Sequence, residues 1–157
     1  MLLLLTAACG DDDGAKATAT PDPGAATALP PLETPTPVPD NGPALSVAVN
    51  TGASYRPTAA ELKALPMSEI NADGNKKGVT IATLAQKVDA KAGYIVTIQG
   101  INADGKTVAF VRKPLSDLAT STVVIIDAQN HVSLASTLLP KTEWLQAVQS
   151  IAFQLAQ

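Results

Sequence analysis

The sequence has few of the side chains that usually carry chemistry. Its 157 residues include one cysteine, one histidine and one tryptophan, and aromatic residues make up only 3%. A single cysteine cannot form an internal disulfide, and it cannot supply a multi-cysteine metal site. The sequence also has no glycine-rich phosphate-binding loop and no nucleophile-elbow motif. These absences leave the chain without a standard catalytic or metal-binding signature.

Positive charge is scarce in the first third of the chain. Up to Pro43 there are six acidic residues against Lys16 alone, a charge of −5, whereas ten Lys/Arg and eight Asp/Glu from Ala44 onward give +2. Neither part has the basic patch with interleaved aromatic residues that nucleic-acid binding needs. We therefore expect no nucleic-acid partner.

Proline is concentrated in the same N-terminal region, where eight of the twelve prolines precede Ala44. Residues 10–43 are mainly Pro, Ala, Thr and Gly with scattered acids, a composition that cannot bury enough apolar surface to offset the entropy of ordering. The alternating Thr and Pro of residues 34–39 favour an extended polyproline II conformation. We predict a disordered stalk over residues 10–43 and one folded domain over residues 44–157.

The first nine residues are a short apolar run that ends in small residues and Cys9. This run resembles the end of a bacterial lipoprotein signal peptide, although Thr6 replaces the usual aliphatic residue three positions before the cysteine. It is also shorter than the usual apolar region of about 7–15 residues and lacks a basic start, so we expect the true start to lie upstream. The resemblance implies that Cys9 is the lipid attachment residue. It also implies an extracytoplasmic protein that is anchored to the membrane or cell surface through its lipid. The alternative is an incidental or buried cysteine.

The folded part is predicted to alternate strands with short helices. Thr58 and Glu61 have the spacing of a capping box before a helix of about two turns that Pro66 ends, and Thr80 can cap a second helix. The pattern of residues 144–155 leaves a helix and a strand both open and leans toward the helix. The other predicted elements are strands over 44–49, 67–70, 122–127 and 132–139, a loop over 71–78, a hairpin over 94–112, and a helical turn over 114–118.

The hairpin has the clearest local design. A three-residue loop with Gly105 in the left-handed conformation places Val96 and Ile98 on the same sheet face as Val108 and Phe110. A two-residue Asp-Gly turn would instead mix these apolar residues with polar ones. We predict the first register because it gathers the large apolar side chains on one face.

Few side chains of the folded part are candidates for chemistry. His131 and Asp127 formally allow Ser-His-Asp catalysis, but we interpret His131 as an exposed histidine in a turn, with nothing nearby in sequence to orient it. Lys76 and Lys77 could contact phosphate, but we interpret them as solvated loop residues. Trp144 could stack on a ligand, yet a domain with five aromatic residues needs its tryptophan for packing.

Several short motifs follow one another in a definite order along the folded part. They are residues 58–66 (TAAELKALP), residues 78–84 (GVTIATL), Asp104 with Gly105, Pro114-Leu115 with Asp117-Leu118, and Trp144 with Val148 and Ile151. Their order and spacing, over residues 55–153, resemble the oxidoreductase molybdopterin-binding domain of the sulfite-oxidase type. The resemblance implies a strand-rich α+β fold in a single compact domain, and it favours a final strand over residues 150–155.

The family's enzymes hold molybdenum through a cysteine that follows the strand equivalent to residues 67–70. This chain has no cysteine there, and the basic residues of its folded part other than lysine are only Arg56, Arg112 and His131. We therefore assign no catalytic, cofactor-binding or metal-binding residue and expect no cofactor. The interpretation is a lipoprotein with a non-catalytic molybdopterin-binding-like domain that binds a small ligand or a protein partner. The alternatives are a reduced molybdopterin-dependent oxidoreductase and a structural envelope protein.

Overall fold

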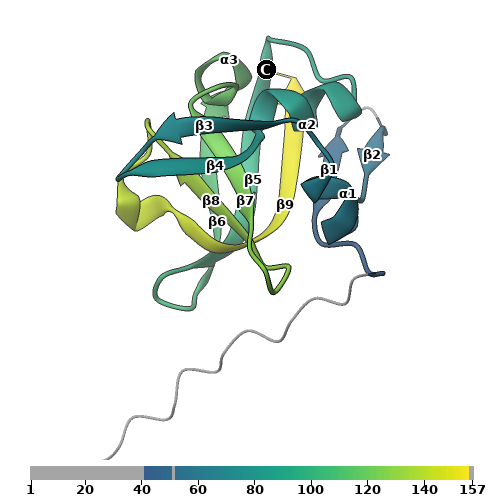
Figure 1. Cartoon of the computed structure of the whole chain (residues 1–157). Helices are drawn as coiled ribbons and strands as arrows, with labels where there is room; N and C mark the ends of the chain where they lie inside the picture. Colours follow the sequence, from purple (N-terminus) through teal and green to yellow (C-terminus); the bar gives the residue numbers. More distant parts are fainter. Residues whose placement is uncertain (1–40, 51, 156–157) are drawn as a thin grey trace, which may run out of the picture. The chain divides into compact units, whose positions relative to one another are not determined.

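The computed structural model describes residues 41–50 and 52–155, which form a strand-rich α+β unit. Two sheets pack face to face around a shared core (Figure 1). In sheet order, the first contains β2 (Ser54–Tyr55), β1 (Ser46–Val49), β9 (Leu145–Leu155), β5 (Tyr94–Asn102) and β6 (Thr107–Pro114). The second contains β3 (Met67–Asn71), β4 (Asn75–Thr80), β7 (Thr122–Ile126) and β8 (Val132–Ser136). The predicted α+β class is thereby confirmed.

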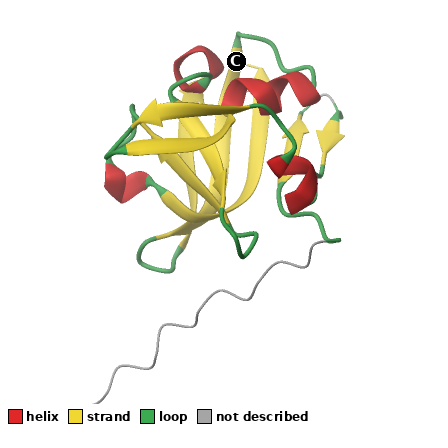
Figure 2. Ribbon diagram, in the orientation of Figure 1, coloured by secondary structure: helices red, strands yellow, loops and turns green. Residues whose placement is uncertain are grey.

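Short helices lie between the strands and at the margins of the two sheets (Figure 2). They are α1 (Ala59–Lys63), α2 (Ile81–Lys87), α3 (Leu115–Leu118) and the 3₁₀ helix η1 (Lys141–Glu143). The predicted capping box is present, because Glu61 N–H donates to Thr58 Oγ1 over 3.2 Å and Thr58 N–H donates to Glu61 Oε2 over 2.8 Å. Thr80 caps α2 as expected, by accepting a hydrogen bond from Thr83 N–H.

The β5–β6 hairpin has the predicted register. Gly105 has a φ of +73°, and its N–H donates to the Asn102 carbonyl in a three-residue loop. Ile98 pairs with Phe110, as the longer loop requires. A bulge then shifts the pairing so that Val96 lies opposite Lys113. The two-residue turn is therefore excluded.

Strand β9 lies at the centre of its sheet, parallel to β1 and antiparallel to β5 (Figure 1, yellow). The predicted strand over residues 150–155 is confirmed and extends back to Leu145, so the helical alternative is wrong. Two bulges explain why the pattern looked helical. Gln146 and Gln149 are extra residues with no partner on β5, which spaces the buried Leu145, Val148 and Ile151 three residues apart.

The approach of β5 to β9 at these bulges requires a glycine. A Cβ atom on Gly100 would lie 2.2 Å from the Ala147 carbonyl oxygen, far inside van der Waals contact. Gly100 pairs with Val148, directly beside the bulge at Gln149. The close approach of β5 to the bulged part of β9 therefore depends on Gly100.

The prediction of a loop over residues 71–78 is right only for residues 72–74, because Asn71 ends β3 and residues 75–78 belong to β4. Asp73 and Gly74 have φ values of +48° and +86° and make a tight turn, after which β4 pairs with β3. The abundant turn formers concealed the strand, because Lys76 and Lys77 break its apolar pattern. Gly78 fits here because a Cβ would lie 2.3 Å from the Val124 carbonyl oxygen of β7.

The apolar residues form a main core between the sheets and a smaller cluster on the outer face of the second sheet. Neighbouring residues of β7 show this division, since Val124 belongs to the main core and Val123 to the outer cluster. Ile70, Ala72 and Ala135 complete the buried part of the outer cluster, and Ile125 and Trp144 pack against it. The second sheet is thus covered on both faces over part of its area.

Candidate functional site

The residue assigned to lipid attachment, Cys9, lies outside the described residues, as do most of the predicted signal and stalk segments. Among the residues that are described, no helix has the length and apolar character to cross a membrane. Within the same residues, no three His, Cys, Asp or Glu side chains gather where they could hold a metal ion.

The side chain of His131 is less exposed than the sequence predicted, and Asp127 orients it. The His131 side chain is only 20% exposed, and its Nδ1 lies 3.1 Å from Oδ2 of Asp127. The other carboxylate oxygen of Asp127 accepts hydrogen bonds from the Gln129 and His131 N–H groups, each over 2.8 Å. The interpretation of His131 as an exposed side chain with nothing to orient it is therefore wrong. The β7–β8 turn brings Asp127 back to His131, a local contact that the spacing of four residues could have indicated.

This environment shifts the pKa of the Asp127 carboxylate. Partial burial raises the pKa of Asp127, but the hydrogen bonds from His131 and Gln129 together outweigh it and lower the pKa below its usual value. The charge of the histidine ring, when protonated, acts in the same direction. Asp127 therefore stays ionised and holds the β7–β8 turn in one conformation.

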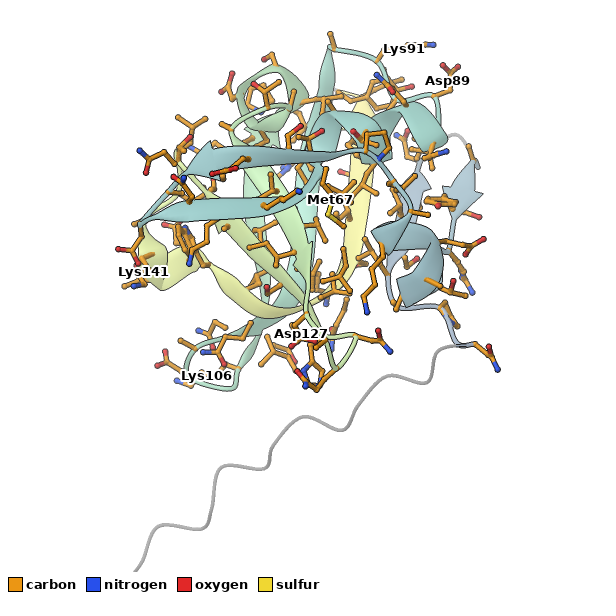
Figure 3. All side chains as sticks on the ribbon, in the orientation of Figure 1. Met67, Asp89, Lys91, Lys106, Asp127 and Lys141 are labelled. Carbon is orange, nitrogen blue, oxygen red and sulfur yellow. The ribbon has the colours of Figure 1, made fainter. Side chains whose placement is uncertain are left out.

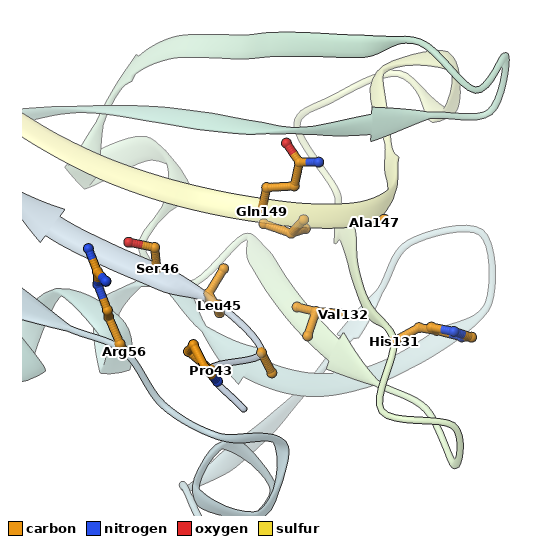
Figure 4. Close-up of a pocket in the computed structure, with 10 residues that line it drawn as sticks. Pro43, Leu45, Ser46, Arg56, His131, Val132, Ala147 and Gln149 are labelled. Atoms are coloured by element: carbon orange, nitrogen blue, oxygen red, sulfur yellow. The ribbon is translucent and has the colours of Figure 1, made fainter. Parts of the chain in front are cut away.

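His131 lies beside a pocket of about 440 Å³ between β1, β8 and β9 (Figure 4). Its lining residues are Pro43, Ala44, Leu45, Ser46, Arg56, His131, Val132, Ala147, Val148 and Gln149. Ser46 and His131 lie at opposite ends of the pocket (Figure 4), so this serine cannot act with the histidine. Asp127 therefore orients the His131 ring, but Ser46 cannot serve as the nucleophile of this pair. Arg112, in contrast, lies on β6, outside this lining.

A second pocket, of about 300 Å³, lies over the outer face of β7 and β8, and we call it the Trp144 pocket. It is lined by Lys76, Ala103, Ile125, Ser133, Leu134, Ala135, Lys141, Trp144, Leu145 and Gln146. Ile125 and Ala135 contribute apolar surface of the outer cluster, and Trp144 packs against that cluster. The pocket therefore combines a largely apolar surface with two lysines.

Trp144 is held in place by its own polar atom. Its indole Nε1–H donates to the Leu139 carbonyl oxygen over 3.2 Å. Since this hydrogen bond uses the only donor of the ring, the surface that Trp144 offers to the pocket is apolar. The prediction that Trp144 packs is confirmed, because the ring contacts both apolar clusters, and it also lines a pocket.

The charges at the Trp144 pocket are unequal. Lys76 and Lys141 both line it, whereas no acidic residue does. Lys141 forms an ion pair with Asp73, in the β3–β4 turn. The hydrogen bond and the charge of Lys141 lower the pKa of Asp73, and Lys76 adds to the effect. Lys76 is half-buried on β4, so its interpretation as a solvated loop residue is wrong.

No protein-family model and no curated protein matches this sequence.

Gln146, Gln149 and Lys141 are among the pocket residues that the sequence interpretation missed. Gln146 and Gln149 are the extra residues of the two β9 bulges, and each lines a different pocket. The three-residue spacing of buried positions in an otherwise strand-like segment could have indicated them. Lys141 had no local signal, because its place at the pocket depends on the path of the chain between β8 and β9.

Proposed function

We propose that this chain is a surface-anchored lipoprotein whose folded part is a non-catalytic module that binds a small ligand in the Trp144 pocket. The observation that carries the binding proposal is the lining of this pocket, with a fixed aromatic ring, apolar side chains and two lysines. Ligand sites are typically concave and mostly apolar, with a few polar groups that set orientation, and have volumes of about 300–1,000 Å³. At about 300 Å³, the Trp144 pocket suits a small ligand.

The anchoring part of the proposal rests on the N-terminal sequence. Cys9 follows small residues and precedes the acidic and proline-rich stalk segment, which would hold the folded part away from a membrane. Mass spectrometry of the N-terminal peptide from cells would test this part. We expect the mass of a diacylglyceryl-modified Cys9, and an unmodified cysteine would contradict the anchor.

We also propose that the folded part is a reduced form of the sulfite-oxidase-type molybdopterin-binding fold. The order of elements along the chain supports this proposal. Helix α1 ends before Pro66, and it is followed by β3, by Gly78-Val79 of β4 shortly before α2, by the β5–β6 hairpin and by the short helix α3. After β3, where the family carries its molybdenum-binding cysteine, this chain has the tight turn at Asp73-Gly74. This replacement supports binding without metal catalysis. Stoichiometric molybdenum in protein purified from its native host would instead establish an oxidoreductase.

The binding proposal can be tested through the single tryptophan of the sequence. The indole N–H of Trp144 gives one resolved signal in a ¹H–¹⁵N NMR spectrum of the full chain carrying Cys9→Ser to prevent lipidation. Benzoate, benzamide and benzylamine are added separately at millimolar concentrations. We expect at least one of them to shift the signal in a saturable manner. The binding proposal fails if none of the three does.

A blocking variant shows whether such a shift comes from the pocket. Ser133 lines the Trp144 pocket, so Ser133→Leu should fill part of it and abolish the shift. Ser68 is an exposed serine on β3 outside the pocket, and Ser68→Leu is the matched control that should leave binding intact. Equal binding by both variants would contradict the pocket as the site.

A further inference from the structure

We infer that the ligand of the Trp144 pocket is a small aromatic monocarboxylate, and that Asp73 competes with it for Lys141. This inference rests on the proposed binding function and specifies its ligand class. It follows from the charge of the lining, the apolar character of the remaining surface, and the ion pair at the entrance.

The first step concerns charge. Both charged residues of the lining, Lys76 and Lys141, are cations. The side chain of Lys76 makes no hydrogen bond or ion pair with another described residue, whereas Lys141 is paired with Asp73. The two ammonium groups outnumber the one carboxylate paired with them, that of Asp73 outside the lining. The pocket therefore keeps a net positive charge, which favours an anion over a neutral or cationic ligand. The ligand therefore carries negative charge.

The second step concerns the body of the ligand. The indole N–H of Trp144 is already bonded to Leu139, so the ring offers only apolar contact. Ile125, Ala135 and Leu145 add further apolar surface. A flat apolar group stacks well against such a wall, and aromatic contacts are worth more than their buried area alone. The size of the pocket limits the body to about one ring system.

The third step identifies the anionic group. Lys141 already binds a carboxylate, that of Asp73, at an exposed position beside the pocket. A carboxylate on the ligand offers Lys141 the same chemistry, so the two carboxylates compete for one ammonium group. Asp73 is therefore a positioning residue, which holds Lys141 at the entrance and lowers the affinity for the ligand.

The chain provides a matched control for this competition. Asp89 also has a positive φ, +55°, and also forms an exposed ion pair, with Lys91. Figure 3 shows that this second pair lies well away from Lys141. Asp73→Asn and Asp89→Asn therefore make the same change in charge and in backbone preference, but only the first alters the Trp144 pocket.

The test is a titration of the Trp144 indole signal in the unlipidated full chain with benzoate, benzamide and acetate. We expect benzoate to bind more tightly than neutral benzamide, because it carries the charge, and more tightly than acetate, because it carries the ring. Lys76→Gln and Lys141→Gln should each reduce the preference for benzoate over benzamide, whereas Lys91→Gln should not. Asp73→Asn should tighten benzoate binding by about twofold to fivefold, the range expected for release of an exposed ion pair, and leave benzamide binding unchanged.

The possible failures are distinct. If none of the probes in either titration series binds, the proposed function fails together with this inference. If benzamide binds as tightly as benzoate, the pocket binds ligands but the anionic class is wrong. If acetate binds as tightly as benzoate, the aromatic body is wrong. If Asp73→Asn affects benzoate no more than Asp89→Asn does, the competition is wrong.

Discussion

Replacing Gly100 by alanine should test the packing that shapes the central strand. The new Cβ would lie 2.2 Å from the Ala147 carbonyl oxygen and 3.0 Å from the Val148 Cα. Carbon and carbonyl oxygen ordinarily meet at about 3.3 Å or more, so β9 must move by about 1 Å. Both neighbouring groups are backbone, and no side-chain rotation relieves the clash.

The cost can be estimated from overpacked cores, in which one extra methyl group destabilises by about 1–3 kcal/mol. We expect Gly100→Ala to fall at the upper end, about 2–3 kcal/mol, because the movement also disturbs the pairing between β5 and β9. The measurement is the free energy of unfolding from urea denaturation followed by circular dichroism. A change of this size is a large part of the roughly 5–15 kcal/mol that stabilises a typical domain.

Gly93 provides the control, because a Cβ there meets nothing within 4 Å. Gly93→Ala should be neutral or stabilise by about 0.4–1 kcal/mol through the lower entropy of the unfolded chain. Equal stabilities of the Gly100→Ala and Gly93→Ala proteins would refute the close approach of β5 to the bulged part of β9.

Three further predictions concern local interactions. Thr58→Ala should destabilise the protein by about 1 kcal/mol through loss of the α1 cap, and Thr58→Ser should restore most of it in the same urea assay; equal stability of all three proteins would contradict the capping role. Thr122→Val should cost about 1–3 kcal/mol, because it removes one of two partners of the buried Ser136 hydroxyl, which lies 2.8 Å from the Thr122 hydroxyl and also accepts from the Leu138 N–H. In calorimetry the double variant Thr122→Val with Ser136→Ala should lose less stability than the sum of the two single losses, and additive losses would argue against the coupling. The lowered pKa of Asp127 means that its stabilising contribution is complete above the unfolded value of about 3.9 and is lost as the pH falls through the lower folded value. The stability difference between the wild type and Asp127→Asn should therefore shrink below about pH 4, and a difference that stays constant down to acid unfolding would contradict it.

Local signals in the sequence were sufficient where one short segment determines the structure. The spacing of Thr58 and Glu61 predicted the capping box, and Gly105 predicted the loop and therefore the register of the central hairpin. In each case the groups that interact are within a few residues of one another, so neighbouring side chains and backbone settle the geometry.

Sequence reasoning failed where the structure depends on contacts with distant segments. The spacing of Leu145, Val148 and Ile151 is helical in a sequence, yet pairing with β5 makes this segment a bulged strand. Lys76 reads as a loop residue until β4 pairs with its neighbours. Lys141 approaches Asp73, 68 positions earlier in the chain, only in the folded protein.

The place of β9 also has a consequence for the order of folding. This strand is synthesised after the eight other strands of the described residues, yet it lies between β1 and β5 and joins them into one sheet. Until β9 arrives, β1 can pair only with the two residues of β2. Because the sheet depends on contacts between distant parts of the chain, folding should be slow and should complete only after synthesis of β9.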